Sequence, residues 1–239
     1  MLRQIRNLMR RGRIRTTFRM PRSRKPRFLR ERPELEMGRY LELLMAHYGK
    51  PDDEIFFVQI GAFDGITNDP LYDLVRARKW RGILVEPQPD AFEKLKQNYA
   101  GQEGLVFENG AVGATDGELT LYTRTSGGTE VASSEKELVA KPGHRADGIR
   151  ALTVPCWTVR TLLERHDATS VDLLQIDAEG LDFEIIKAID FDSVAPPIIR
   201  FEHTIISGSD FNACLAYLAE RGYRFLLEDT DTIAYRGEN

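Results

Sequence analysis

The sequence predicts an α/β fold: a doubly wound, mostly parallel sheet that ends in an antiparallel C-terminal hairpin. Two observations carry this prediction. Segments that are apolar throughout alternate with amphipathic helical segments, as expected when helices cover both faces of a parallel sheet. The last two expected strands are separated only by residues 228–231, which is too short for a crossover, so these two strands must pair antiparallel.

Helices are expected where apolar residues recur at three- and four-residue intervals. The first, 34–48, is followed by Gly49, which favours a helix end. The second opens with Asp69 as its N-cap and Pro70 at its first position. The other expected helices, in chain order, are one marked by Phe92, Leu95 and Tyr99, then 158–166, 183–189, and one through 211–218 that Gly222 ends.

Strands are expected at short apolar runs between these helices. In chain order they are 55–60, 82–86, 105–107, 119–122, 171–177, 197–203, 223–227 and 232–235. The segment 124–150 interrupts the pattern, because it is polar and nearly free of large apolar residues. A loop of that length inside a compact domain is usually functional or disordered, and we interpret this one as a substrate lid.

Charge divides the chain into a basic arm, 1–32, and a domain, 33–239. Residues 1–30 hold 12 Lys and Arg and no acidic residue, whereas the remainder holds 21 basic and 37 acidic residues. Three interpretations of the arm stay open: contact with an anionic membrane surface or an acidic partner, a mitochondrial presequence if the source is eukaryotic, or a solvated tail. The arm has no apolar stretch typical of a secretory signal.

Composition excludes several classes of protein. A hydrophobic fraction of 42% excludes wholesale disorder, and no apolar run is long enough to span a membrane as a helix. Two cysteines, Cys156 and Cys214, cannot form a disulfide framework or a four-thiolate zinc site. We therefore expect a reduced, cytoplasmic protein, with peripheral membrane contact through the arm as a further option and no nucleic-acid partner. The oligomeric state is not predicted.

The residues that follow the strands predict a ligand, because open parallel sheets bind ligands at the carboxyl ends of their strands. Gly61 and Gly65 follow the first strand and permit tight turns. Glu86 ends the second strand, 25 residues beyond Gly61, where a carboxylate can accept both hydroxyl protons of a ribose. Asn109 begins the small-residue run NGAVG, which leaves room for an adenine ring. This pattern predicts an adenosine-containing ligand.

Phe63 and Ile66 distinguish between adenosine ligands. In a dinucleotide fingerprint, G-x-G-x-x-G, that starts at Gly61, these two residues occupy the second and third glycine positions. Phe63 leaves no room for a pyrophosphate, and the P-loop lysine motif is absent. S-adenosylmethionine has no phosphate, and Asp64 could face its cationic amino-acid end or its sulfonium. The residues therefore favour S-adenosylmethionine over a nicotinamide dinucleotide.

Five segments between residues 55 and 203 carry a family pattern. In chain order they are VQIGAFDGITNDPLY, ILVEPQPDAFEKLKQN, NGAVG, TVPCWTVRTLLE and VDLLQIDAEGLDFEIIKAI. Together they resemble the FkbM family of S-adenosylmethionine-dependent class I methyltransferases. The resemblance implies a Rossmann-like class I sheet. It also implies O-methylation of a hydroxyl group on a sugar, a glycolipid or a secondary metabolite of the polyketide type.

The resemblance also implies roles for residues by their position. The implied cofactor-binding residues are Gly61, Asp64, Gly65, Glu86, Asn109 and Asp177, and the residues implied to border the methyl group are Asp177 and Glu179. One position departs from the pattern. Many class I enzymes have an acidic residue two positions before the first glycine, where this chain has Gln59.

A catalytic base is expected, because an alcohol is a poor nucleophile at neutral pH. Of the four histidines only His203 lies at the carboxyl end of an expected strand, so His203 is the predicted base, with Asp177 and Glu179 as further catalytic residues. Together with Glu202, these two carboxylates could instead hold a magnesium ion. We favour no metal, since acidic side chains beside a cationic cofactor already have a reason to be there.

Two functions of other classes stay open. One is a nicotinamide-dependent oxidoreductase, which Phe63 and Ile66 disfavour. The other is a non-catalytic adenosine-ligand module that the basic arm recruits to an acidic partner. The acceptor, a small molecule or a glycan, cannot be identified from the sequence, because the segment 124–150 contains no recognisable motif.

Overall fold

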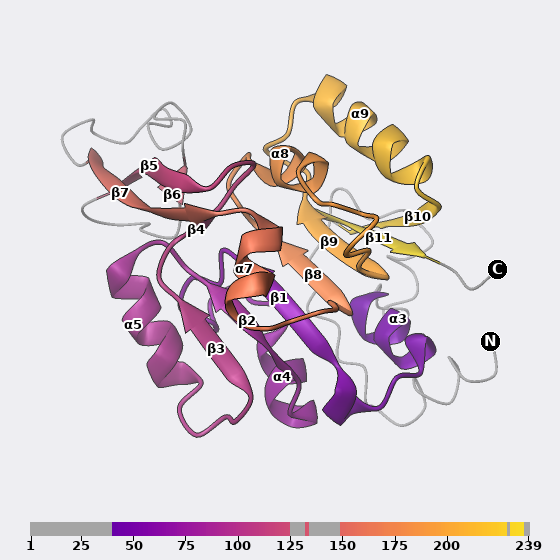
Figure 1. Ribbon diagram of the computed structural model, residues 1–239, viewed down its shortest axis with the longest axis horizontal. Helices are drawn as coiled ribbons and strands as arrows, with labels where there is room; N and C mark the ends of the chain where they lie inside the picture. Colours follow the sequence, from indigo (N-terminus) through magenta and orange to yellow (C-terminus); the bar gives the residue numbers. More distant parts are fainter. Residues whose placement is uncertain (1–39, 125–131, 134–148, 229, 237–239) are drawn as a thin grey trace, which may run out of the picture.

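The computed structural model describes residues 40–124, 132–133, 149–228 and 230–236 (Figure 1). Its main sheet has seven strands in the order β10-β11-β9-β8-β1-β2-β3. These strands are β1 (Phe56–Ile60), β2 (Arg81–Val85), β3 (Leu105–Glu108), β8 (Leu173–Ile176), β9 (Ile198–Glu202), β10 (Tyr223–Leu227) and β11 (Asp231–Arg236). The predicted fold class is therefore confirmed.

The strand order of the main sheet reverses between β1 and β8. The five strands from β3 to β9 pair in parallel, whereas β11 lies antiparallel between β9 and β10, which confirms the predicted hairpin. The chain runs from β1 outward through β2 to β3, and then returns to β8 on the other side of β1. Ligands of open α/β sheets bind where the strand order reverses in this way, here at the carboxyl ends of β1 and β8.

Helices cover both faces of the main sheet. The helices α7 (Val159–Arg165), α8 (Asp182–Lys187) and α9 (Gly208–Ala219) share one hydrophobic core, and α3 (Tyr40–Tyr48), α4 (Tyr72–Arg78) and α5 (Pro89–Asn98) share the other. A short 3₁₀ helix, η1 (Asp52–Glu54), precedes β1. Along β1, Val58 and Ile60 enter the first core and Phe57 enters the second. Burial of both faces explains why these strands are apolar throughout.

A second sheet was only partly predicted. Its strands are β4 (Ala111–Val112), β5 (Gly117–Arg124), β6 (Ala132–Ser133) and β7 (Ile149–Trp157), in the order β4-β7-β5-β6. The strand expected at 119–122 is the middle of β5, but β7 was missed. Several residues of β7 are exposed and it contains Pro155, so it lacks the continuous apolar run that marked the other strands.

The segment 124–150 was predicted to be one long loop, but part of it forms strands. Arg124 is the last residue of β5, β7 begins at Ile149, and Ala132 and Ser133 pair with β5. The other residues of this segment lie outside the described part of the chain, and so does the basic arm, 1–32. The proposed lid and the contacts of the arm therefore stay predictions. Among the described residues, no helix is both long enough and apolar enough to cross a membrane.

The helix α4 begins later than predicted, and this matters for the site. Asp69 is not its N-cap, because the helix starts at Tyr72 with Leu71 in the capping position. The Asp69 carboxylate instead accepts a hydrogen bond from the backbone N–H of Leu71 through Oδ1, at 2.7 Å. The segment between β1 and α4 thus turns the Asp69 side chain toward the sheet rather than along the helix.

Candidate active site

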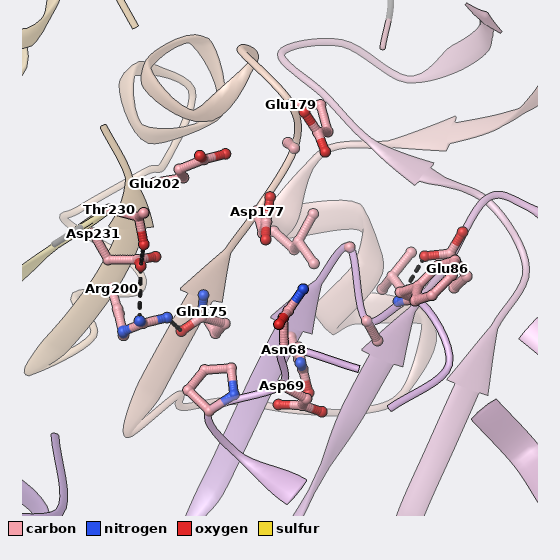
Figure 2. A pocket seen from close by; sticks show the side chains of 18 of the residues that line it. Asn68, Asp69, Glu86, Gln175, Asp177, Glu179, Arg200, Glu202, Thr230 and Asp231 are labelled. Atoms are coloured by element: carbon pink, nitrogen blue, oxygen red, sulfur yellow. Dashed lines mark hydrogen bonds and ion pairs between the residues drawn. The ribbon is translucent and has the colours of Figure 1, made fainter. Parts of the chain in front are cut away.

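A cavity of about 1470 Å³ opens at the carboxyl ends of β1, β2, β8 and β9 (Figure 2). Its volume exceeds the range of about 300–1,000 Å³ typical of single small-molecule sites, so it can hold a nucleoside-sized ligand together with a second substrate. Leu119 and Leu121 of β5 also line it, so the second sheet forms part of its wall. The cavity lies where the strand order predicts a ligand.

The lining of this cavity is strongly acidic. Its acidic side chains are Glu42, Asp69, Asp73, Glu86, Asp177, Glu179, Glu202, Glu228 and Asp231. Among the described residues Arg200 is the only basic side chain that lines it. A lining of this charge favours a cationic ligand and opposes a pyrophosphate or another anion.

Arg200 is fully engaged by neighbouring side chains. Its Nε lies 2.8 Å from Glu228 Oε2 and its Nη2 lies 2.9 Å from Asp231 Oδ2. Its Nη1 donates to Gln175 Oε1 at 3.1 Å. Because two carboxylates already neutralise the guanidinium, Arg200 does not offset the negative charge of the remaining lining.

Glu86 is held at the end of β2 by the backbone of two loops. Its Oε2 accepts from the N–H of Phe63 and its Oε1 accepts from the N–H of Gln88, each at 2.8 Å. Burial raises the pKa of Glu86 to about 7, against the opposing effect of these two hydrogen bonds. Glu86 lines the cavity and also fixes the turn that follows β1, and its predicted contact with the cofactor stays a prediction.

Gly61 lies where the ends of β1 and β8 come closest to each other. It has φ +75°, and a Cβ atom placed there would lie 1.9 Å from the carbonyl oxygen of Asp177. The carbonyl of Val85 accepts hydrogen bonds from the N–H groups of both Gly61 and Ala62, at 3.0 Å. Glycine is thus required by the close approach of β1 to the end of β8. The contact between these two strand ends explains the glycine by itself, without a close approach of the backbone to a ligand.

Asp177 and Glu179 follow β8 and both line the cavity. The Asp177 side chain is open to the cavity, yet it lies deep among protein atoms. This burial, together with the carboxylates of Glu202, Asp182 and Glu179, raises the pKa of Asp177 to about 8. Asp182 is fully buried and accepts from the N–H of Glu202 at 3.2 Å. Asp177 is therefore a carboxylate with a raised pKa at the centre of the cavity (Figure 2).

Four predicted site residues do not line the cavity: Asp64, Gly65, Asn109 and His203. The Asp64 carboxylate accepts from the N–H groups of Ile66 and Thr67. Partial burial alone would raise the pKa of Asp64, but these hydrogen bonds lower it. A Cβ atom on Gly65 would lie 2.6 Å from the Leu95 side chain of α5. Both residues shape the turn after β1, and their predicted contacts with the cofactor stay predictions.

The side chains of Asn109 and His203 contact other residues of the protein and do not line the cavity. Asn109 Nδ2 donates to the carbonyl oxygens of Glu86 and Pro87, so it supports the end of β2. The ring of His203 stacks on Phe211, with centroids 5.0 Å apart, and its Nδ1 lies 3.1 Å from Thr232 Oγ1. The structure thus places Asp177, and not His203, inside the cavity.

The structure gives no support to the alternative magnesium site. Among the described residues, no group of three His, Cys, Asp or Glu side chains has an arrangement that could hold a metal ion. Asp177, Glu179 and Glu202 line the same cavity without forming such a group.

Several lining residues were given no role by the sequence analysis, which noted Gln59 only as a departure from the class I pattern. Gln59, Gln175 and Arg200 occupy matching positions of β1, β8 and β9, and so form one polar row across the sheet. A polar residue inside an otherwise apolar strand is the signal that could have found them. Asp69 was missed because its place before a proline matched an N-cap equally well.

Comparison with known proteins identifies the family. The model of the methyltransferase FkbM domain matches residues 59–225, well over half of the 239-residue chain. None of the proteins with curated descriptions matches the chain.

Solved structures of methyltransferases are similar to this chain. A methyltransferase FkbM from Methylobacillus flagellatus aligns with a TM-score of 0.52 at 15% identity, over 77% of this chain and 44% of that one. This chain thus spans less than half of that protein. An rRNA methylase from Streptococcus thermophilus aligns with a TM-score of 0.46 at 11% identity, over 85% of this chain and 100% of that one. A precorrin-6y C5,15-methyltransferase from Geobacter metallireducens aligns with a TM-score of 0.44 at 11% identity, over 85% and 91%.

The matched segment begins at Gln59, near the end of β1, and extends into β10. It therefore includes the carboxyl end of every parallel strand and most of the residues that line the cavity, whereas Glu42, Glu228 and Asp231 lie outside it. The fold is that of Rossmann-like methyltransferases, as predicted, and the chain belongs to the FkbM methyltransferase family.

Proposed function

We propose that this protein is an S-adenosylmethionine-dependent O-methyltransferase that methylates a hydroxyl group of a sugar, a glycolipid or a secondary metabolite. The observation that carries the proposal is the acidic cavity at the strand-order reversal, whose one described basic side chain is already paired. S-adenosylmethionine carries a sulfonium, an ammonium and a carboxylate group and no phosphate, so its net positive charge fits this lining.

The half of the cavity near β2 suits the adenosine part of the cofactor. Glu86 is buried there with both carboxylate oxygens fixed by backbone N–H groups, and it can accept further hydrogen bonds from the ribose hydroxyl groups. Gly110, Ala111 and Val112 also line the cavity, and their small or apolar side chains suit a flat base. These contacts need no phosphate cradle.

Asp177 is the best-placed base for the acceptor. When bound, S-adenosylmethionine supplies a methyl group on a positively charged sulfur. Asp177 would take the proton of the acceptor hydroxyl group onto its carboxylate as the acceptor oxygen bonds to that methyl group; the methyl–sulfur bond would break in the same step, and S-adenosylhomocysteine would leave as the neutral thioether. Its raised pKa lies close to neutral pH, which is where a general base works best. In this role Asp177 replaces His203, which lies outside the cavity.

The alternative functions have less support. A nicotinamide dinucleotide would bring a pyrophosphate into a cavity lined by nine acidic side chains. The same charge opposes a nucleic-acid acceptor and favours one that is uncharged. A non-catalytic module would bind the cofactor without transferring its methyl group, so turnover is the measurement that separates it from an enzyme.

Transfer of a labelled methyl group tests this proposal. The intact chain would be incubated with methyl-labelled S-adenosylmethionine and panels of neutral glycosides, glycolipids and hydroxylated metabolites, and products would be analysed by mass spectrometry. We expect a mass gain of one methyl group on an oxygen of at least one neutral acceptor. Methylation confined to nitrogen or carbon atoms, or to anionic acceptors, would contradict it.

A further inference from the structure

Asp182 is a buried carboxyl group to which the proposed reaction gives no role. It is the first residue of α8, is 1% exposed, and does not line the cavity. Carboxyl groups are almost never fully buried in proteins unless other groups hold them. The partners of Asp182 therefore indicate what this residue does.

The Asp182 carboxylate joins two strand ends. Its Oδ2 accepts from the N–H of Ala178, at 3.4 Å, in the loop that follows β8. Its Oδ1 accepts from the N–H of Glu202, at 3.2 Å, in the last position of β9. Because Ala178 lies between Asp177 and Glu179, this carboxylate ties the loop that carries both of these cavity-lining residues to the end of the neighbouring strand (Figure 2).

The loop after β8 needs such a support, because its backbone is strained. Glu179 has φ +50° and Gly180 has φ +103°, both in the left-handed region. Glycine adopts this region readily, whereas a glutamate does so only where the surrounding structure holds it there. From the second sheet, Ser133 Oγ donates to the carbonyl oxygen of Glu179 at 3.0 Å. The loop is thus held by Ser133 of β6 and by Asp182 of α8.

Charge also couples Asp182 to Asp177. After burial itself, the groups that raise the pKa of Asp177 are the carboxyl groups of Glu202, Asp182, Glu179 and Asp231. Burial, and then the charge of Glu202, raises the pKa of Asp182 to about 7, and the Cys214 thiol of α9 also lies near it. Of the four carboxyl groups near Asp177, only that of Asp182 does not line the cavity. It can therefore act on Asp177 without contact with a substrate.

We propose that Asp182 is a positioning residue for methyl transfer: its carboxylate holds the loop after β8 so that Asp177 faces the acceptor hydroxyl group. The inference rests on the proposed function, because it requires Asp177 to be the base. It assigns to Asp182 an effect on the alignment of Asp177 and a second effect on the affinity of Asp177 for a proton.

Asp182→Asn and Asp172→Asn form a matched pair of variants. Asp172 directly precedes β8, at the opposite end of that strand from Asp177, and is 3% exposed. Its carboxylate accepts from the N–H of Phe56, at 2.8 Å, and pairs with Lys50. Each variant keeps the size of the side chain and removes a buried charge that holds the backbone of a neighbouring strand. Both should lower the melting temperature, but only Asp182→Asn should affect Asp177.

The ionisation of Asp177 can be followed by NMR in the intact chain, isotope-labelled at the aspartate carboxyl carbons and free of cofactor and acceptor. The resonance that is missing from Asp177→Asn identifies this residue. We expect the midpoint of its titration to fall by about one pH unit in Asp182→Asn, because a nearby like charge is lost, and to stay unchanged in Asp172→Asn. An unchanged midpoint in Asp182→Asn, or an equal fall in both variants, would overturn the inference.

Methyl transfer tests the alignment of Asp177, with the neutral acceptor that the labelled-methyl experiment identifies. In Asp182→Asn, kcat should fall about 10-fold and KM for S-adenosylmethionine should stay within about 2-fold, because the base is misplaced while the cofactor site is intact. The rise of kcat/KM with pH should end about one pH unit lower. Asp172→Asn should keep both kcat and the pH profile. Equal losses of kcat in the two variants would show that Asp182 acts only on folding.

A further measurement covers the case in which Asp182→Asn does not fold. In the unaltered chain, the amide resonances of Ala178 and Glu202 should shift together as Asp182 ionises near pH 7. Absence of this joint shift would overturn the inference. No methyl transfer by the unaltered chain would instead contradict the proposed function, and the NMR titrations, which need no turnover, would still show whether Asp182 controls the ionisation of Asp177.

Discussion

Asp177→Asn is expected to lower the rate of methyl transfer by about 100-fold or more, the range typical for loss of a general base. The variant keeps the size of the side chain and resembles the protonated form that the raised pKa of Asp177 already favours at neutral pH. Binding of S-adenosylhomocysteine should therefore stay within a few-fold. The measurement is steady-state kinetics alongside calorimetric titration.

The dependence of kcat/KM on pH tests whether Asp177 is this base. Asp177 must be ionised to accept a proton, and its pKa lies near 8, above the ordinary value of 3.8. The value of kcat/KM should therefore rise with pH up to about 8 and then level off, and this rise should be absent in Asp177→Asn. A wild-type profile that is flat between pH 6 and about 8 would contradict the assignment.

His203→Ala decides between the two candidate bases. The His203 ring stacks on Phe211 and contacts Thr232, outside the cavity, so its loss should leave the rise with pH in place. Loss of that rise in His203→Ala, with the rise retained in Asp177→Asn, would restore the assignment made from the sequence.

Glu86→Ala is expected to weaken S-adenosylhomocysteine binding by about 10- to 100-fold. The substitution removes the acceptor for the ribose hydroxyl groups and leaves the N–H groups of Phe63 and Gln88 without their partner, each loss costing about 1–3 kcal/mol. Calorimetric titration measures the change. Since 5′-methylthioadenosine also carries the ribose, it should be weakened to the same extent.

Glu108→Ala is the matched control for Glu86→Ala. Glu108 also ends a parallel strand, β3, but its carboxylate contacts Arg165 and His166 and does not line the cavity. Affinity should be unchanged in this variant. Equal weakening in both variants would show that Glu86 acts only by stabilising the sheet, and would remove it from the binding site.

Binding should also depend on pH through Glu86. Its pKa in the folded chain is near 7, above the ordinary 4.5, so its contribution to folding stability is present below pH 4.5 and is lost as the pH rises through about 7. Hydroxyl donors of a bound ribose favour the ionised carboxylate. Affinity for S-adenosylhomocysteine should therefore increase between pH 6 and about 8, and Glu86→Gln should reduce this increase.

The parallel sheet could be predicted because its strands are buried on both faces. The runs at 55–60 and 171–177 are apolar for that reason, and their parallel pairing follows from the fold class. The strand β7 could not be found in this way, since it is half exposed and contains Pro155. Its partner is β5, across a long segment, and such pairing leaves little local signal.

Site residues could be predicted where their place at a strand end is enough to bring them to the cavity. Glu86 and Asp177 stand directly at strand ends, and both line the cavity. Asp64 and His203 occupy similar positions, but local turns and ring packing direct their side chains elsewhere. Asp69 shows the converse, because it looks like an N-cap in the sequence, whereas the helix starts three residues later, at Tyr72, and Asp69 lines the cavity instead.

Calorimetric titration of the intact chain with S-adenosylmethionine, S-adenosylhomocysteine and NAD tests the central claim most directly. The acidic cavity should bind the first two with micromolar affinity, the cationic S-adenosylmethionine at least as tightly as the neutral thioether, and should give no heat with NAD. Binding of NAD, or of none of the three ligands, would contradict the claim that this cavity is a site for S-adenosylmethionine.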